Sequence, residues 1–110
     1  MKRIVFGMVV CLASGTAAYA QDAAAAKGEA VFTAQKCSLC HSIGDKGNKK
    51  GPLDGVGSKL SAADLRAWVV DATGMTAKTK APRKPVMKNY SLPKEDVDAL
   101  VAYMATLKKP

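Results

Sequence analysis

The stretch Lys36–Gly44, KCSLCHSIG, holds two cysteines three positions apart and a histidine directly after the second. His41 is the only histidine among the 110 residues. The remaining cysteine, Cys11, lies in an apolar run near the start of the chain. Closely spaced thiols of this kind serve a redox-active disulfide, a zinc site or the covalent attachment of a cofactor. The rest of the sequence has to decide between these uses.

Residues 1–20, MKRIVFGMVVCLASGTAAYA, combine a basic start, an apolar run and an A-x-A cleavage site. The apolar run is about half as long as a membrane-spanning helix requires. We therefore expect a cleavable signal peptide over residues 1–20, export to the periplasm and a mature domain over residues 21–110. Loss of Lys2 and Arg3 would lower the formal net charge of +8 by two, so the mature domain would stay basic.

The mature chain has the pattern of helices separated by long loops. Apolar residues at helical spacing predict helices over residues 22–36, 61–74 and from about 93 to 109. Residues 37–59 and 75–92 are rich in glycine, proline or lysine, so we expect loops there and no strands. The fold class is therefore all-α, with three or so helices. Loops this long in a small domain usually wrap a ligand or carry a function.

The apolar side chains look too few for a domain of this size. Four residues supply all the aromatic bulk of the mature chain: Phe32, Trp68, Tyr90 and Tyr103. Small domains often need a disulfide, a metal or a cofactor to be stable. A disulfide between Cys37 and Cys40 would close too short a loop to restrict the unfolded chain much. We therefore expect a large apolar group from outside the sequence to complete the core.

Residues 37–41, CSLCH, form the C-x-x-C-H pattern of c-type haem attachment. Two thiols on one turn can form thioethers with the two vinyl groups on one edge of a porphyrin, and the next residue is then carried beneath the ring. We expect one haem c, attached through Cys37 and Cys40, with His41 bound to the iron. A thiol–disulfide catalyst would expect a βαβ context, and a structural zinc site would need further ligands. These two remain the alternatives.

The motif lies in a context that resembles the small single-haem class I c-type cytochromes over essentially the whole mature chain. The shared features are a short helix ending in C-x-x-C-H, the segment Gly51–Leu53, a methionine-bearing loop and a terminal helix, DVDALVAYMATL. The resemblance implies a cytochrome c-like fold wrapped around the haem. In that fold the terminal helices cross, which implies contacts from Gly28 and Phe32 on the first helix. Leu100 and Tyr103 are their counterparts on the last.

The resemblance also implies how the haem iron is held. The family's proline carbonyl accepts a hydrogen bond from the haem-binding imidazole, which implies this role for Pro52, with a simple turn residue as the alternative. The second axial ligand cannot be another histidine, because His41 is the only one. Met87 follows a stiff Pro-Val pair and shortly precedes the terminal helix, as the family's ligand methionine does. Met75, or no protein ligand, is the alternative, and Met104 belongs to the apolar stripe of the last helix.

A closed His/Met site predicts an electron carrier and not an enzyme, because the thioether raises the potential and occupies the position where small molecules bind. The alternatives are a haem sensor or peroxidase-like protein with an open sixth site, and a haem subunit of a larger oxidoreductase. Carbon monoxide binding and the size of the native particle distinguish these three possibilities.

The charge distribution predicts the partners. Basic residues gather in both long loops: Lys46, Lys49, Lys50, Lys78, Lys80, Arg83, Lys84 and Lys88. If both loops flank the haem edge, they form a positive collar that favours redox partners with acidic docking surfaces. Nucleic acid is a poor candidate, since these loops carry hardly any stacking aromatic residues. We expect a monomer without a stable membrane anchor.

Overall fold

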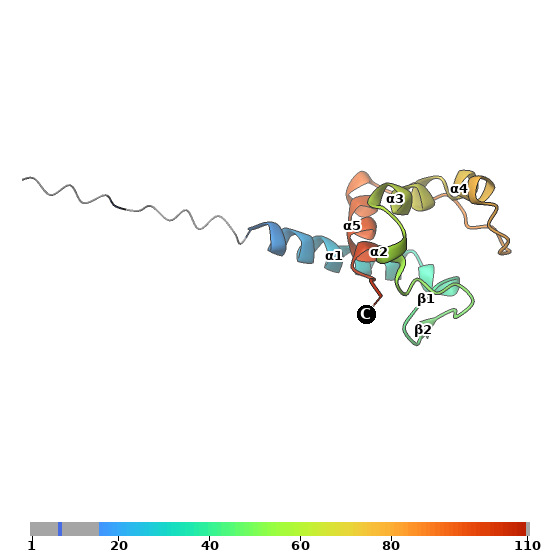
Figure 1. Cartoon of the computed structure of the whole chain (residues 1–110), viewed down its shortest axis with the longest axis horizontal. Coiled ribbons are helices and arrows are strands. Elements are labelled where there is room, and N and C mark those ends of the chain that lie inside the picture. Colours follow the sequence, from blue (N-terminus) through green and yellow to red (C-terminus); the bar gives the residue numbers. More distant parts are fainter. Residues whose placement is uncertain (1–6, 8–15, 110) are drawn as a thin grey trace, which may run out of the picture.

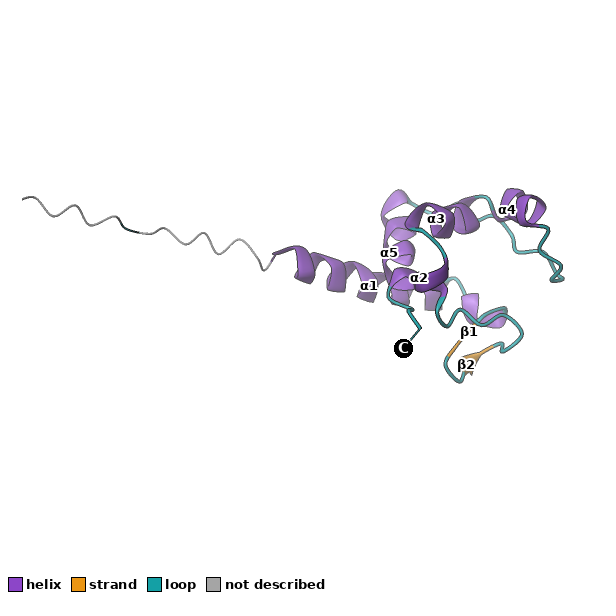
Figure 2. Ribbon diagram, in the orientation of Figure 1, coloured by secondary structure: helices purple, strands orange, loops and turns teal. Residues whose placement is uncertain are grey.

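The computed structural model describes residue 7 and residues 16–109, which form a helical domain with a short pair of strands (Figure 1, Figure 2). The elements are, in chain order, α1 (Thr16–Ala34), the 3-10 helix η1 (Cys37–Leu39), β1 (Ser42–Ile43), β2 (Lys46–Gly47), α2 (Val56–Lys59), α3 (Ala62–Val70), α4 (Ala72–Thr79) and α5 (Lys94–Ala105). Helices α1, α3 and α5 correspond to the three helices expected from the sequence. None of the helices in this described part of the chain is both long and apolar enough to cross a membrane.

Helix α1 begins earlier than the sequence pattern indicated. Residues 1–6 and 8–15 of the expected signal peptide lie outside the described residues, whereas residues 16–20 are the first residues of α1. The helix continues through an alanine-rich stretch, since alanine has the highest helix propensity. It ends at Ala34, and Lys36 then adopts a left-handed conformation with φ 57°. This change of direction separates α1 from the C-x-x-C-H motif.

Helices α1 and α5 cross in close contact, as the resemblance implied. A Cβ atom at Gly28 would collide with the carbonyl of Ala99 and the Cβ of Tyr103, so the close approach of the two backbones requires a glycine there. The rings of Phe32 and Tyr103 meet edge to face, with centroids 5.8 Å apart. Leu100 is buried in the same apolar core as Phe32. The expected crossing is therefore confirmed.

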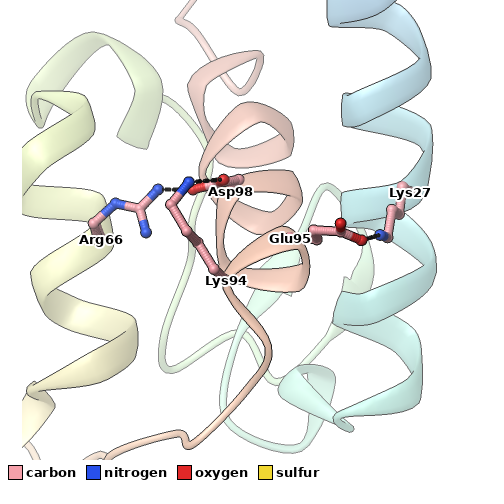
Figure 3. A network of polar contacts seen from close by, with 5 residues as sticks. All are labelled: Lys27, Arg66, Lys94, Glu95 and Asp98. Atoms are coloured by element: carbon pink, nitrogen blue, oxygen red, sulfur yellow. Dashed lines mark hydrogen bonds and ion pairs between the residues drawn. The ribbon is translucent and has the colours of Figure 1, made fainter.

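Helix α3 packs against α5 on the side away from α1 (Figure 3). Its N-terminus is capped by Ser61, whose hydroxyl accepts a hydrogen bond from the backbone N–H of Asp64, three residues later. Arg66 of α3 forms an ion pair with Asp98 of α5. On the opposite side, Lys27 of α1 contacts Glu95 of α5. The buried core between the helices consists of Phe32, Leu65, Val69, Val97, Leu100, Val101 and Met104.

Three local expectations were wrong. Residues 56–59 form the short helix α2 inside the segment that was expected to be a loop. Instead of a single helix that stops near Gly74, α3 ends at Val70 and α4 follows, because the Asp71 carboxylate caps a new helix by accepting the Gly74 N–H at 3.1 Å. Residues 75–79 are therefore helical and not part of a loop. The expectation of no strands also fails, since β1 and β2 pair antiparallel, with Ser42 opposite Gly47.

Candidate haem-binding site

A cavity of about 630 Å³ lies between α3, the segment that follows α1 and the loop that follows α4. This volume is within the range of about 300–1,000 Å³ that is common for cofactor sites. Its lining is mostly apolar, with Leu65, Trp68 and Val69 from α3 and Leu100 and Met104 from α5. All the candidate site residues from the sequence line this cavity as well: Cys37, Cys40, His41, Pro52 and Met87. The fold therefore brings together residues from three separate segments.

The two cysteines lie on one tight turn. The N–H groups of Cys40 and His41 both donate to the carbonyl of Cys37, at 3.1 and 2.9 Å. In a 3-10 turn, side chains three positions apart lie above one another, so both thiols border the same space. Both thiols are free, with Cys37 half-buried and Cys40 exposed. Burial raises the pKa of Cys37, which favours the protonated thiol.

His41 is held in a defined tautomer. Its Nδ1 lies 3.0 Å from the carbonyl oxygen of Gly51. A carbonyl oxygen only accepts, so Nδ1 carries the proton and Nε2 keeps its lone pair for a metal. Burial lowers the pKa of His41, the hydrogen bond to Gly51 opposes this shift, and the charge of Arg83 reinforces it. The neutral ring that metal binding requires is therefore favoured.

The acceptor of the imidazole proton is Gly51, one residue before the expected Pro52. Residues 51–53 pair with Ser42 in a parallel bridge. Ser42 N–H donates to Gly51 at 3.1 Å, and Leu53 N–H donates to the Ser42 carbonyl at 2.8 Å. Carbonyls alternate in direction along an extended segment, so this pairing directs the Gly51 oxygen toward His41 and the Pro52 oxygen away from it.

Met87 and Met75 occupy different environments. Met87 is half-buried and lines the same cavity as His41. Met75 is buried in α4 and is not among the residues that line this cavity. Met104 lies in the core of α5, as expected, and also borders the cavity. His41 and Met87 therefore line the same cavity, and Met75 does not.

Arg83 and Tyr90 are among the cavity residues that were not assigned to the site from the sequence. The side chain of Arg83 lies against Gly51, where a Cβ atom would collide with its guanidinium. Tyr90 lines the cavity beneath Lys88, whose Nζ is 4.9 Å from the ring centroid. From the sequence, Arg83 was assigned only to the expected positive collar, and Tyr90 only to the aromatic bulk of the mature chain. The only sequence signal that placed Tyr90 at the site was its position three residues after Met87.

Comparisons with known proteins assign the chain to a family. Residues 25–108 match the family model described as cytochrome c. The chain belongs to the cytochrome c family. Membership confirms the predicted fold class and the covalently bound haem c, and it suggests haem-based electron transfer. Family members are typically electron carriers.

Two relatives show partial matches. The chain is 50% identical to cytochrome c2 of Blastochloris viridis over 54 residues, which cover 48% of this chain and 39% of that protein. It is 30% identical to cytochrome c oxidase subunit 2 of Alkalihalophilus pseudofirmus over 91 residues, which cover 74% of this chain and 25% of that protein. The matched regions thus span well under two thirds of either relative. No solved structure matches the chain significantly.

The residues present fit a covalently bound haem. Cys37 and Cys40 offer two free thiols on one turn. His41 offers an unprotonated Nε2 at the wall of the same cavity. The remaining wall is mostly apolar, as a porphyrin plane requires. The cofactor also explains the shortage of aromatic side chains, because the haem completes the core.

Proposed function

We propose that this chain is an exported one-electron carrier with a single haem c held by His41 and Met87. The observation that carries the proposal is that His41 and Met87 line one cavity while Met75 is buried elsewhere. Cys37 and Cys40 attach the haem, and the bound haem supplies reversible one-electron chemistry at its iron. A thioether in the sixth position raises the potential and excludes oxygen and peroxide.

The protein residues orient the cofactor and limit access to it. Gly51 accepts the Nδ1 proton of His41, which fixes the ring and raises the basicity of Nε2. Apolar side chains from α3 and α5 line the cavity and would limit the access of water to the haem. With His41 and Met87 both bound to the iron, the site would exchange electrons and perform no further chemistry. The chain would therefore not act as an enzyme.

The basic residues at and near the cavity support docking to acidic partners, whereas Lys46, Lys49 and Lys50 of the first loop do not line it. Lys36, Arg83 and Lys88 line the cavity itself. The exposed side chains of Lys80 and Lys84 belong to the same loop as Met87. This distribution places positive charge beside the site of electron exchange, which would steer an acidic redox protein and weaken at high salt. We place the carrier in the periplasm, following the expected signal peptide over residues 1–20.

The proposal is tested by the visible spectrum of the oxidised haem-loaded protein. Sulfur bound to ferric haem gives a weak charge-transfer band in the far red. We expect the band in the wild type and in Met75→Ala, and its loss in Met87→Ala. Met75→Ala is the matched control, since loss of a buried methionine costs about 2–5 kcal/mol of stability without touching the iron. A wild type without the band would refute His/Met ligation and favour a sensor or peroxidase-like function.

A second candidate is a haem subunit fixed to a larger oxidoreductase. The match to a protein named as an oxidase subunit favours this possibility, because a region similar to this chain is part of that longer chain. The redox chemistry would be the same, but the partner would be permanent. Gel filtration of the native extract separates the two. A carrier elutes at about the size of the single chain, whereas a subunit elutes with its complex.

A further inference from the structure

Asn48 connects the C-x-x-C-H turn to the segment that carries Gly51. Its side-chain amide Nδ2 donates to the carbonyl of Leu39 at 3.1 Å, and its Oδ1 accepts from Lys50 N–H at 3.0 Å. Its backbone adds three more hydrogen bonds, to partners Ser38, His41 and Gly51. The Asn48 N–H donates to the carbonyls of Ser38 and His41, at 3.0 and 3.1 Å. The Asn48 carbonyl accepts from the Gly51 N–H at 3.1 Å.

These hydrogen bonds connect the C-x-x-C-H turn, through Asn48, to Gly51, which in turn is bonded to His41. The Oδ1 atom closes an Asx turn over residues 48–50, and the Asn48 carbonyl closes the turn that ends at Gly51. Nδ2 anchors this turn to Leu39, which lies between the two cysteines. Gly51 then accepts the Nδ1 proton of His41. The turn held by Asn48 therefore fixes the acceptor together with the bridge between Ser42 and Pro52.

We propose that Asn48 is a positioning residue that sets the hydrogen bond between His41 and Gly51 and thereby the donor strength of the imidazole. This inference rests on the proposed ligation of the iron by His41. A firm Nδ1–H···O bond makes Nε2 a better donor, which stabilises the oxidised iron and lowers the potential. Loss of the Asn48 side chain loosens the acceptor, so the potential rises.

The strand pair places Asn48 at this point. Gly47 has φ +94°, and a Cβ atom at this position would collide with the carbonyl of His41. This close approach brings the N–H of the next residue, Asn48, within reach of the C-x-x-C-H turn. An asparagine suits the position because its amide offers a donor and an acceptor at once. Aspartate retains only the acceptor, and alanine retains neither.

The test uses the haem-loaded, reduced protein labelled with 15N. For Asn48→Ala we expect exchange of the Ser42 amide proton, which is bonded to Gly51, to accelerate about tenfold through loss of two hydrogen bonds. We also expect a shifted His41 Nδ1–H resonance and a higher reduction potential. Asn48→Asp should accelerate Ser42 exchange at least as much, because its carboxylate faces the Leu39 carbonyl without a proton to donate. The milder variant Asn48→Ser should give a smaller change of the same sign.

Asn89→Ala is the matched control, because Asn89 also bonds one backbone N–H, that of Thr73, at 2.9 Å. It should leave Ser42 exchange and the His41 Nδ1–H resonance unchanged. Unchanged Ser42 exchange in the Asn48 variants would overturn the inference, as would faster exchange with an unchanged potential in Asn48→Ala. The proposed function fails separately, through a wild-type spectrum without the far-red band.

Discussion

The two segments that supply the proposed axial ligands are held to the domain very differently. Residues 37–53 form a dense set of hydrogen bonds, including a strand pair and a parallel bridge at Ser42. The loop over residues 80–93 is joined to α3 and α4 mainly by Tyr90 N–H to Val69 at 2.9 Å and by the Asn89 side chain. The histidine side is thus organised by the protein itself, whereas the methionine side is held by few bonds.

Charge increases this difference. The methionine-bearing loop carries four basic residues within nine positions: Lys80, Arg83, Lys84 and Lys88. Among the described residues, none of these four side chains forms an ion pair with an acid. Like charges at this density repel one another and favour opening of the loop. Local opening with a low free energy is expected where bonds are few and exposed, so ligand exchange should begin at Met87 and not at His41.

The largest expected effect lies in the rigid segment, with Gly47→Ala. An alanine there would have to adopt φ +94°, and its Cβ atom would collide with the His41 carbonyl. Together these two effects should lower the free energy of unfolding by about 3 kcal/mol. Urea unfolding of the haem-loaded protein measures the loss. Gly44→Ala is the control, because Gly44 also has a positive φ of +59° but nothing lies within 4 Å of the added atom. It should lose only about 1 kcal/mol. Equal losses would mean that the contact with His41 is not rigid.

A smaller and more local effect is expected in the loop, with Asn89→Ala. Removal of its bond to Thr73 should lower the opening free energy by about 1 kcal/mol and so raise the population of open loop about fivefold. Carbon monoxide should bind the reduced protein faster by that factor, with little change in the urea midpoint. Thr33→Ala removes a comparable side-chain bond on α1 and should leave carbon monoxide binding unchanged. A lower midpoint with unchanged binding would show that the loop unfolds only with the whole domain.

The contrast also explains which features were predictable from the sequence. Helical periodicity identified α1, α3 and α5, and the spacing of Cys37, Cys40 and His41 identified the cofactor, because both depend on residue type at a fixed interval. The crossing at Gly28 followed from the resemblance. These features recur wherever the same local pattern or the same family occurs, so they can be recognised without coordinates.

The features that were missed depend on hydrogen bonds between segments. Helix α4 begins because the Asp71 side chain accepts the Gly74 N–H, and a sequence pattern does not show which polar residue will cap. The acceptor of the His41 proton is Gly51 because of a bridge to Ser42 that no local pattern predicts. Asn48 was overlooked for the same reason. Its partners are brought together only by the fold.

The smallest effect is expected at a site that belongs to neither segment. Asp98 on α5 accepts from Lys94 at 2.9 Å and pairs with Arg66 of α3 (Figure 3). The Lys94 hydrogen bond, followed by that of Arg66, lowers the pKa of this carboxyl below its usual value. A lowered pKa means that the carboxylate stabilises the fold at pH values above its unfolded pKa of about 3.9. This stabilisation is lost as the pH falls through the lower folded value.

Asp98→Asn should therefore be less stable than the wild type at pH 7, and the difference should shrink below about pH 4 and vanish in stronger acid. Urea unfolding at several pH values measures it. A difference that persists in acid would assign the effect to packing and not to charge. Hydrogen exchange can show whether this ion pair affects the two segments, because Asp98 joins α5 to α3 and lies in neither segment. In Asp98→Asn at neutral pH, the Ser42 amide should still exchange more slowly than the Tyr90 amide. The hydrogen bonds of these two amides do not involve α5, so the substitution should not change this order.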